Sequence, residues 1–391
     1  MKILIAHNRY QQRGGEDVVV DLEYEMLRAA GIDVTLREVD NNGIQGIAAK
    51  LMTAAMVAYN PWGRAWMRDQ IADVRPDIVH VHNSFPRLSP SIYDACRDAG
   101  VPVVQTLHNF RISCAAGTFV RDGRACEQCL TGSSYQAVAY RCYRGSILGS
   151  LALASMIDHH KRAKTYARKV DQFIALTEFS RSKYVAAGLP AERIAVKPNT
   201  APDHGRSGDT VARQGALYVG RLSPEKGVEF LLDAWNGIDY PLRVAGTGPL
   251  AAALAAHAPK NVTFLGAIDP AKVRAEMARA AFLVVPSTCY EGFPMVIAEA
   301  YASGLPVLAS RIGSLAEVVN PGVSGHLFEP GDTGSLATVL RRTIRNPVEL
   351  ASLSKTARAT YDAKYSGHVV LQQLLAIYTR VLSKRDIVTR V

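Results

Sequence analysis

Short apolar runs alternate along the chain with segments in which apolar residues recur every four positions. In the first half, strands are predicted at residues 2–6, 33–36, 77–80, 102–106 and 172–175. Between the first two runs, Val18, Leu22, Met26 and Ala30 recur four positions apart, which is typical of one face of a helix. Alternating strands and helices predict a parallel sheet that is covered by helices on both faces.

The same pattern restarts in the second half, after a polar stretch without periodicity. Strands are predicted there at residues 216–219, 242–245, 262–265, 282–285 and 306–309. We therefore predict an α/β protein of two Rossmann-like, doubly wound domains that face each other across a cleft. The expected parts are domain 1–198, linker 199–214, domain 215–365, and a C-terminal helix within 366–391 that packs on the first domain.

Composition narrows the class of protein. Of the 391 residues, 48% are hydrophobic and 20% are charged, which fits a globular protein with room for two cores. No apolar run reaches the roughly 18 residues that a membrane span needs. The opening residues 1–6 are too short and too soon polar for a secretory signal, so a cytoplasmic location is expected.

The net charge of +10 is uneven, because residues 111–169 contain ten basic and three acidic residues. Such a segment suits nucleic acid, an anionic membrane, an anionic substrate, or simply a solvated face.

Two cations follow the first predicted strand of the second domain. Arg221 and Lys226 lie five positions apart in the sequence VGRLSPEKG, at a point where a strand ends and a helix begins. Two fixed cations at that place suit a diphosphate. The alternative is a surface turn with two solvated cations.

Two carboxylates come after a later strand of the same domain. Glu291 and Glu299 belong to the segment YEGFPMVIAEAYAS, in which Pro294 suits the first turn of a helix. The unpaired N–H groups of such a turn favour phosphate. Glu299 could accept hydroxyls of a ribose, and Glu291 could bind sugar hydroxyls. Two ordinary surface glutamates are the alternative.

In their order and spacing, these two motifs resemble the retaining family 4 glycosyltransferases of the GT-B fold. The resemblance covers nearly the whole chain, and its most specific part is the pair Glu291 and Glu299 with Gly-Phe-Pro after the first glutamate. It implies that Arg221 and Lys226 hold the donor pyrophosphate. It also implies that Glu291 contacts the donor sugar and that Glu299 contacts the ribose. The backbone at Gly292, Phe293 and Pro294 is expected to support the phosphate and the sugar.

The resemblance extends to the first domain. It implies that the loop with Gly14 and Gly15 lies against the donor phosphates and the acceptor, although a plain turn is the commonest use of glycine pairs. It also places His108, at the end of a predicted strand, beside the reacting sugar. Further candidates of lower rank are His80, His82 and Ser180.

A glycine-rich turn at Gly246 is a partial loop for phosphate or base. The acidic residue that a dinucleotide fingerprint requires about 20 positions later is missing, so NAD is not inferred. The base is expected near Gly266 and Ile268, and the sequence leaves UDP and GDP types open. No Asp-x-Asp motif follows a strand, so no cofactor is expected for catalysis. Retention of configuration is implied by the resemblance alone.

Four cysteines lie close together in the first half. Cys114, Cys126, Cys129 and Cys142 have zinc-site character, with one C-x2-C pair in a polar turn. The segment also resembles a four-cysteine insertion, at about 110–145, of a subgroup of the family. A structural zinc ion is the favoured interpretation, and reduced thiols or a redox site are the alternatives.

Residues 148–169 join an apolar run to a basic one, and residues 58–67 add Trp62, Arg64 and Trp66. These groups suit an anionic membrane surface, and a helix with one hydrated face is the alternative. A peripheral protein on the inner face of the cytoplasmic membrane would act on a glycan or polyprenyl-linked glycan, as in polysaccharide or lipopolysaccharide assembly.

The sequence leaves three functional classes open. The favoured one is a hexosyl-type, retaining glycosyltransferase. A nucleotide-sugar epimerase on the same fold would turn over the nucleotide sugar without an acceptor. A zinc-containing nucleic-acid-binding protein would show salt-sensitive binding, but the recognition motifs of such proteins are missing, so no nucleic-acid partner is expected.

Overall fold

The computed structural model describes residues 1–203, 205 and 213–389, and the side chains to residue 384. The chain divides into two compact units: unit 1 contains residues 1–119, 127–198 and 370–391, and unit 2 contains residues 120–126 and 199–369. Of the predicted linker 199–214, residues 204 and 206–212 lie outside the described residues, as do residues 390–391 of the predicted C-terminal segment.

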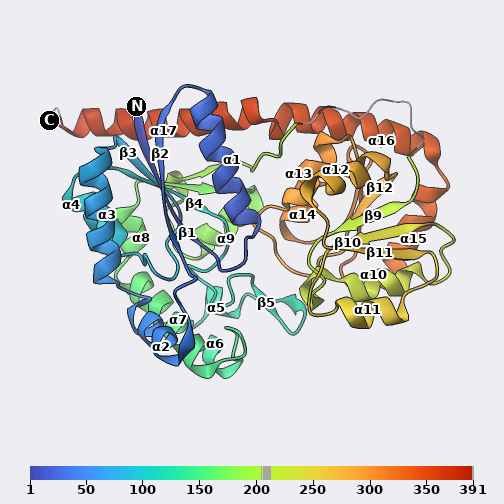
Figure 1. The fold of residues 1–391 in the computed structure, drawn as a ribbon, viewed down its shortest axis with the longest axis horizontal. Helices are drawn as coiled ribbons and strands as arrows, with labels where there is room; N and C mark the ends of the chain where they lie inside the picture. The colour runs from blue at the N-terminus through green and yellow to red at the C-terminus, as the bar shows by residue number, and fades with distance from the viewer. Residues whose placement is uncertain (204, 206–212, 390–391) are drawn as a thin grey trace. The chain divides into compact units, whose positions relative to one another are not determined.

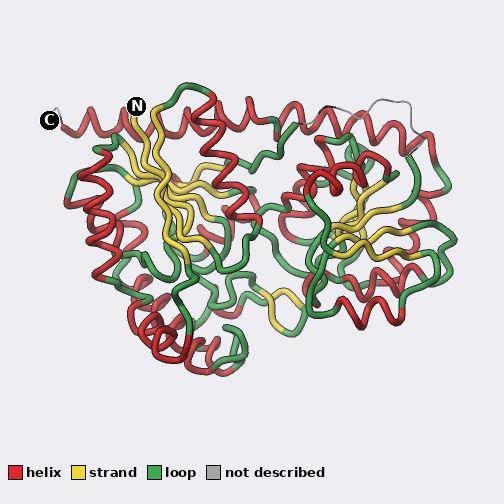
Figure 2. Tube along the Cα trace, in the orientation of Figure 1, coloured by secondary structure: helices red, strands yellow, loops and turns green. Residues whose placement is uncertain are grey.

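Unit 1 is built on a parallel sheet with the strand order β2-β1-β3-β4-β7-β8 (Figures 1 and 2). Its strands are β1 (Lys2–Arg9), β2 (Asp33–Asp40), β3 (Ile78–Asn83), β4 (Val103–Leu107), β7 (Gln172–Ala175) and β8 (Ile194–Val196). Its helices are α1 (Gly15–Ala29), α2 (Gly46–Met56), α3 (Pro61–Val74), α4 (Ile92–Asp98), α5 (Gln128–Thr131), α6 (Gln136–Ala139), α7 (Ile147–Arg162), α8 (Thr165–Lys169), α9 (Glu178–Ala186) and η1 (Ala191–Arg193).

Unit 2 repeats this plan, with the strand order β11-β10-β9-β12-β13-β14. Its strands are β9 (Ala216–Val219), β10 (Leu242–Ala245), β11 (Val262–Gly266), β12 (Phe282–Val285), β13 (Val307–Ser310) and β14 (Gly325–Phe328), with a separate antiparallel pair β5 (Val120–Arg121) and β6 (Arg124–Ala125). Its helices are η2 (Pro224–Lys226), α10 (Val228–Trp235), α11 (Ala251–His257), α12 (Pro270–Arg279), α13 (Met295–Ala302), α14 (Gly313–Val318), α15 (Thr333–Ile344), α16 (Pro347–Thr360) and η3 (Tyr361–Tyr365).

The predicted α/β class with two doubly wound domains agrees with this architecture. The sequence pattern missed the edge strands β8 and β14. β8 has three residues, and β14 contains Gly325 and His326, so neither forms the apolar run that marks a central strand. β3 also continues past its predicted end at residue 80. His80 and His82 therefore lie within the strand and are buried.

Helix α17 (Gly367–Thr389) contributes its apolar side chains to the core of unit 1. Leu374, Ile377 and Tyr378 are buried in one cluster with Ile3 of β1 and Val20 of α1. Helices α1 and α17 thus cover the same face of the sheet (Figure 1). The last helix of the chain completes the core of the first sheet.

This packing gives a first prediction. Leu374→Ala should lower the free energy of unfolding of unit 1 by about 2–5 kcal/mol, because the fully buried leucine leaves a cavity in the core. Urea unfolding followed by tryptophan fluorescence and circular dichroism measures the loss. The control Arg380→Ala changes an exposed residue of the same helix and should stay within about 0.5 kcal/mol of wild type. Equal stability of Leu374→Ala and wild type would contradict the packing.

Candidate active site

Two loops at the carboxyl ends of β9 and β10 are bonded to each other through their backbones in unit 2. Gly220 N–H donates to the Ala245 carbonyl (3.0 Å), and Leu222 N–H donates to the Thr247 carbonyl (2.8 Å). Gly246 has a φ of 142°, and a Cβ there would collide with the Gly220 carbonyl oxygen. Glycine is therefore required at 246 to let the loops approach this closely, and the predicted turn lies at the ligand-binding edge of the sheet.

The ammonium of Lys226 and the carboxylate of Glu291 form an ion pair at the same edge. Lys226 Nζ lies 2.9 Å from Glu291 Oε1, and the Ser287 hydroxyl donates to the same oxygen at 2.6 Å. Burial acts to raise the pKa of Glu291, but the Lys226 ammonium and the Ser287 hydrogen bond hold it below its usual value. Glu291 is thus a carboxylate that points at a cation, as expected of a group beside a diphosphate and a sugar.

Arg221 is exposed at the end of β9 and lies five residues before Lys226. Within the described residues, no carboxylate forms an ion pair with its guanidinium, and the Arg221 carbonyl accepts the Tyr218 hydroxyl at 2.9 Å. The backbone is held in place while the cation stays available to an anion.

Lys226 is followed by Gly227, whose φ of 68° and contact with the Pro286 carbonyl leave no room for a side chain.

The segment after β12 leads into helix α13. The Gly292 carbonyl accepts the Ser314 hydroxyl (3.2 Å), and the buried Phe293 ring packs against Tyr365. Pro294 is the residue just before α13, whereas the sequence predicted it within the first turn of the helix. The N–H groups of the first turn of α13 remain the donors that this helix end can offer to phosphate.

Glu299 lies in α13 and is mostly buried. Burial raises the pKa of this carboxyl to about 7, although the nearby Arg274 acts to lower it. Near neutral pH the group therefore exchanges between an acid that can donate a hydrogen bond and a carboxylate that accepts hydroxyls.

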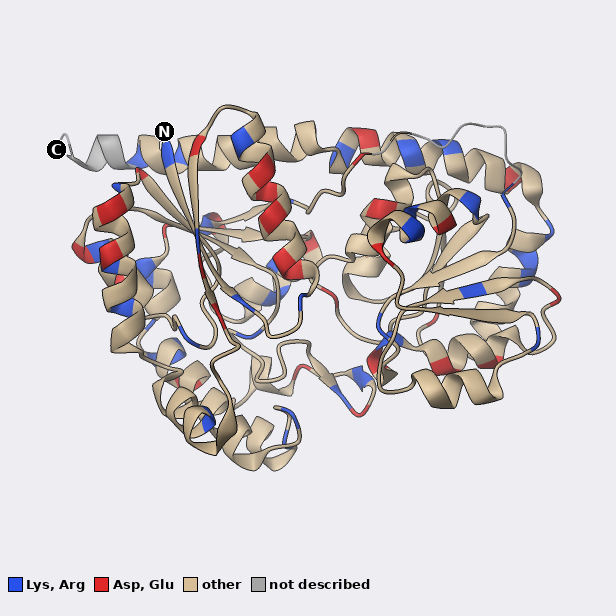
Figure 3. Cartoon of the chain, viewed as in Figure 1, with Lys and Arg blue, Asp and Glu red and all other residues tan. Residues whose placement is uncertain are grey.

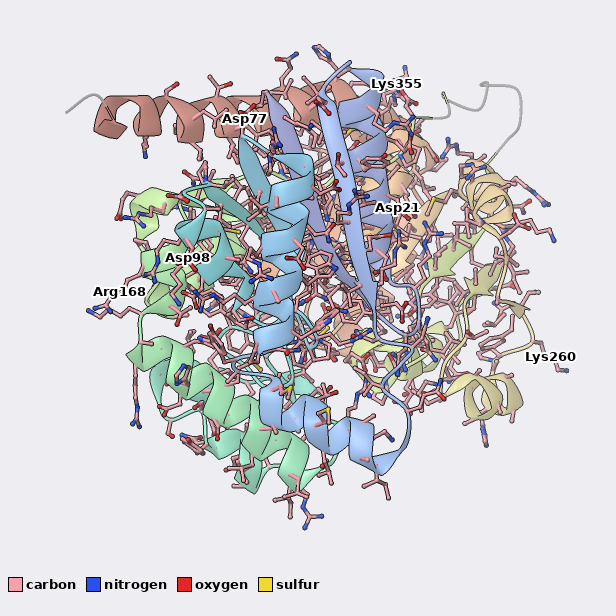
Figure 4. The ribbon with its side chains drawn as sticks, turned by 60° about the vertical axis from the view of Figure 1, so that its left-hand side comes forward. Asp21, Asp77, Asp98, Arg168, Lys260 and Lys355 are labelled. Atoms are coloured by element: carbon pink, nitrogen blue, oxygen red, sulfur yellow. The ribbon has the colours of Figure 1, made fainter. Side chains whose placement is uncertain are left out.

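The glycine loop of unit 1 is tied to the start of α1. Gly14 is the residue before the helix, and its N–H donates to Asp17 Oδ2 at 2.8 Å. The other Asp17 oxygen lies 2.8 Å from His7 Nε2, and both of these side chains are buried. Asp21, labelled on α1 in Figure 4, binds Arg13 from the loop at 2.5 Å. Gly15 is the first residue of α1. These contacts hold the loop at the carboxyl end of β1.

Glu16 is a group in this loop to which sequence reasoning gave no role. Its Oε2 accepts hydrogen bonds from the Tyr10 hydroxyl (3.0 Å) and from Asn109 Nδ2 (3.2 Å), while its buried Oε1 has no hydrogen-bond partner among the residues that the structure describes. Burial raises the pKa of Glu16 to about 8. An acidic residue at a helix start is common, so the sequence carried no signal for this acid. Its partner Asn109 is distant in the chain.

His108 follows directly after β4 and lines a small cavity of about 40 Å³, which is enough for a water molecule. His82, Asn83, Asn109 and Arg111 line the same cavity. His108 Nε2 lies 2.9 Å from His82 Nδ1, and the two rings are stacked. The structure thus places His108 beside polar groups from the ends of β3 and β4, and its contact with the reacting sugar stays a prediction.

His80 has no atom left for a ligand. Its Nδ1 lies 2.7 Å from the Tyr378 hydroxyl and its Nε2 lies 2.8 Å from the Thr106 hydroxyl. Within the described residues, Glu23, His80 and His82 form a group whose ligand atoms lie within 4.8 Å of one another. Lys197 Nζ, however, lies 2.5 Å from Glu23 Oε1. The lysine and the engaged His80 nitrogens do not suit a cation, so His80 packs the core of unit 1.

Ser180 has a local role in the structure. Its N–H donates to Thr177 Oγ1 at the start of α9, which is an N-cap hydrogen bond.

The four cysteines do not form a group of metal-ligating atoms within 4.8 Å among the described residues. Cys114 is buried, and Cys126, Cys129 and Cys142 are half-buried. Cys129 and Cys142 pack on an apolar cluster that includes Ala115 and Leu153. Cys126 belongs to unit 2 and the other three cysteines belong to unit 1, and the structural zinc site stays a prediction.

Two family models match successive parts of the chain. The model "Glycosyl transferase 4-like domain" matches residues 14–200, and the model "Glycosyl transferases group 1" matches residues 213–346. The chain is 27% identical to a phosphatidyl-myo-inositol mannosyltransferase of Mycobacterium leprae, over 84% of this chain and 80% of the relative. It is 30% identical, over 56% of its length, to an exopolysaccharide phosphotransferase of Streptomyces coelicolor, of which it spans 24%.

The fold has solved counterparts. The crystal structure of HepE from Anabaena in complex with UDP matches 97% of this chain and 100% of that chain, with a TM-score of 0.69 and 19% identity. A complex of HepE with UDP-glucose matches as well. The chain is a glycosyltransferase of the GT-B fold, with a glycosyl transferase 4-like domain followed by a group 1 domain. The predicted fold class and general function are confirmed, and the epimerase alternative finds no support.

The raised pKa of Glu299 gives a second prediction. A carboxyl whose pKa is higher in the folded than in the unfolded chain stabilises the fold fully below pH 4.5, and this contribution is lost as the pH rises through about 7. Glu299→Gln lacks the titration, so its stability relative to wild type should increase between pH 5 and pH 8 by up to about 3 kcal/mol. Urea unfolding at both pH values measures this difference. An equal difference at pH 5 and pH 8 would contradict it.

Proposed function

We propose that the protein is a retaining, hexosyl-type glycosyltransferase that moves a sugar from a nucleotide-diphosphate sugar to a glycan or polyprenyl-linked glycan in cell-surface polysaccharide assembly. The observation that carries the proposal is the group of Arg221, Lys226 and Glu291 at the carboxyl edge of the unit 2 sheet. The names of two relatives refer to a phosphatidyl-myo-inositol mannosyltransferase and to an exopolysaccharide phosphotransferase, which supports a glycan or glycolipid acceptor. A structural neighbour with bound UDP supports a nucleotide-diphosphate sugar as donor.

The donor site follows from the charges. Breaking the bond between sugar and diphosphate leaves negative charge on the phosphates and positive charge on the sugar. Arg221 and Lys226 would stabilise the diphosphate, together with the N–H groups at the start of α13. Glu291 would face the sugar, and Glu299 would accept ribose hydroxyls when it is ionised. Two side-chain cations supply the charge for the leaving group, so turnover without a metal cofactor is part of the proposal. UDP and GDP types both fit.

The acceptor chemistry is proposed for unit 1. His108, Asn109 and Arg111 line a cavity at the ends of the strands, and the Gly14–Gly15 loop lies beside Glu16, which bonds to Asn109. Neutral imidazole, amide and protonated carboxyl groups bind sugar hydroxyls without a competing ionic partner. A front-face reaction, in which the leaving phosphate takes the proton of the acceptor, would account for retention.

We further propose that unit 1 docks on the anionic inner face of the cytoplasmic membrane. Helix α2 has no buried residue, and Ile47, Leu51 and Met52 are 78%, 55% and 64% exposed. Helix α7, which contacts α2, exposes Ile147 and Leu148. In the described part of the chain, no helix is long and apolar enough to cross a bilayer. Exposed apolar side chains of this kind suit a surface that enters the headgroup region.

Charge supports the same surface. Residues 41–68 and 128–157 contain no Asp or Glu but contain Lys50, Arg141 and Arg144. In Figure 3, the helices labelled α2, α6 and α7 in Figure 1 are mostly tan with isolated blue segments. Each cation near an anionic leaflet contributes about 1 kcal/mol. The predicted basic segment 148–169 is thus joined by α2, which the sequence pattern did not single out as a membrane contact.

The donor site gives a third prediction. Thermal shift and calorimetry with UDP, GDP and their sugars should show stabilisation by one nucleotide class. Arg221→Ala and Lys226→Ala should each weaken its binding by about 10- to 100-fold, because each removes a charge-assisted contact with phosphate. Arg341→Ala is the matched control: it is exposed in the last turn of α15, toward the amino ends of the strands. Turnover is then followed as nucleotide release with glycan and polyprenyl-linked acceptors. Equal binding by all three variants, or no binding by wild type, would contradict the site.

The membrane surface gives a fourth prediction. Wild type should co-sediment with vesicles that contain phosphatidylglycerol and bind much less to pure phosphatidylcholine vesicles. The triple variant Ile47→Ser, Leu51→Ser, Met52→Ser should bind at least about tenfold more weakly, because three exposed apolar side chains no longer enter the bilayer. The control Val348→Ser removes a residue that is 80% exposed on α16 and should bind like wild type. Equal sedimentation of the triple variant and wild type would exclude this surface.

A further inference from the structure

Glu23 of α1 and Lys197, the residue after β8, bring opposite charges into the interior of unit 1. Their side chains are 1% and 0% exposed, and Glu23 Oε1 lies 2.5 Å from Lys197 Nζ. Two buried charges are tolerated only as a close pair with further hydrogen bonds. The ammonium occupies Oε1 and leaves the second carboxylate oxygen, Oε2, open to another donor.

Two buried atoms without hydrogen-bond partners face each other at that second oxygen. Glu23 Oε2 and His82 Nε2 each lack a partner among the described residues, and they lie 3.6 Å apart. The distance exceeds that of a hydrogen bond, but a carboxylate oxygen only accepts, so its negative charge favours the form of His82 that carries the proton on Nε2. No other described group offers Nε2 of His82 an acceptor.

His82 is neutral, so one proton decides the role of both of its nitrogens. Burial, with the neighbouring imidazoles of His80 and His108, lowers its pKa well below the usual value. With the proton on Nε2, His82 Nδ1 can only accept, and its neighbour at 2.9 Å is His108 Nε2. His108 must then carry its own proton on Nε2.

The second nitrogen of His108 is also left with a defined hydrogen-bonding state. Burial, and the nearby His7 and Lys197, lower the pKa of His108 well below its usual value, so this ring also carries one proton. With that proton on Nε2, Nδ1 has a lone pair. Among the described residues no hydrogen bond is made to His108 Nδ1, and the ring lines the cavity with Asn109 and Arg111.

We propose that Glu23 is a positioning residue for His108: through His82 it places the proton on His108 Nε2 and leaves Nδ1 as an acceptor for a substrate hydroxyl. The inference deepens the proposed function, on which the role of His108 rests. It specifies the chemistry of the partner, because a hydroxyl can donate to Nδ1 and an ether oxygen cannot.

The test has a readout that does not depend on activity. In full-length protein with ¹⁵N-labelled histidine, two-bond ¹H–¹⁵N spectra distinguish a protonated ring nitrogen from a bare one, and His82→Gln and His108→Gln assign the signals. Wild type should show Nε2–H for both rings. A wild-type His108 with its proton on Nδ1, or a doubly protonated His108 near neutral pH, would overturn the proposal.

The decisive variant is the double change Glu23→Met with Lys197→Met. It replaces the buried pair with apolar side chains of similar length, which often preserves folding. The His108 signals should then show the Nδ1–H form in a substantial fraction, and kcat should fall about tenfold at nearly unchanged donor KM. The control Tyr378→Phe keeps the charges of Glu23 and Lys197 and removes a hydrogen bond to His80 Nδ1, which lies 4.0 Å from Glu23 Oε2. It should retain the wild-type His108 spectrum and kcat.

The outcomes separate the two proposals. An unchanged His108 spectrum in the double variant overturns the positioning role of Glu23, whatever the activity. A changed spectrum with unchanged kcat also overturns that role in turnover. If wild type transfers no sugar from any nucleotide sugar, the proposed function fails, while the wild-type and double-variant spectra still decide whether Glu23 controls the proton on His108.

Discussion

Glu23 and Lys197 meet where α1, β3, β4 and the end of β8 converge, and the polar interior of unit 1 is arranged around this ion pair. An unpaired charge there would be strongly destabilising, so each residue requires the other. The spare carboxylate oxygen faces His82, and His82 contacts His108 at the cavity. One buried pair in the core thereby sets the hydrogen-bonding state of a ring at the ligand-binding edge of the sheet.

Parallel sheets impose a second constraint, which both units share. The carboxyl ends of adjacent strands lie at one edge, and the loops that leave them come close together. In unit 2, these loops are bonded backbone to backbone, and Gly246 permits the approach. Unit 2 presents Arg221, Lys226 and Glu291 at this edge, whereas unit 1 presents neutral histidine, amide and acid groups. The same architecture thus provides a site with an ion pair in unit 2 and, in unit 1, a site of neutral polar groups beside the Arg111 cation.

Much of the fold followed from periodicity, because the central strands are buried on both faces and form unbroken apolar runs. The edge strands β8 and β14 did not, since a short or glycine-containing strand forms no such run. For helix α2, the apolar pattern of the sequence would suggest burial, and the structure shows exposure. Its residues 46–56 are apolar almost throughout, yet none is buried. The composition of a helix does not state which neighbours cover it, so only the packed structure shows α2 as an exposed apolar surface.

The sequence by itself determined the two-domain α/β class, and it predicted the donor motif because Arg221, Lys226, Glu291 and Glu299 occur in short segments next to strands. Their meeting was not determined by spacing along the chain, because the contact of Lys226 with Glu291 joins residues 65 positions apart and depends on the adjacent strands β9 and β12. Only the tertiary structure decided the partners of Glu16, Glu23 and His82, which are separated from Asn109, Lys197 and His108 by 26 to 174 residues. Contacts at such separations depend on strand order and on burial, which remove water and leave each buried polar atom to find its partner across the core.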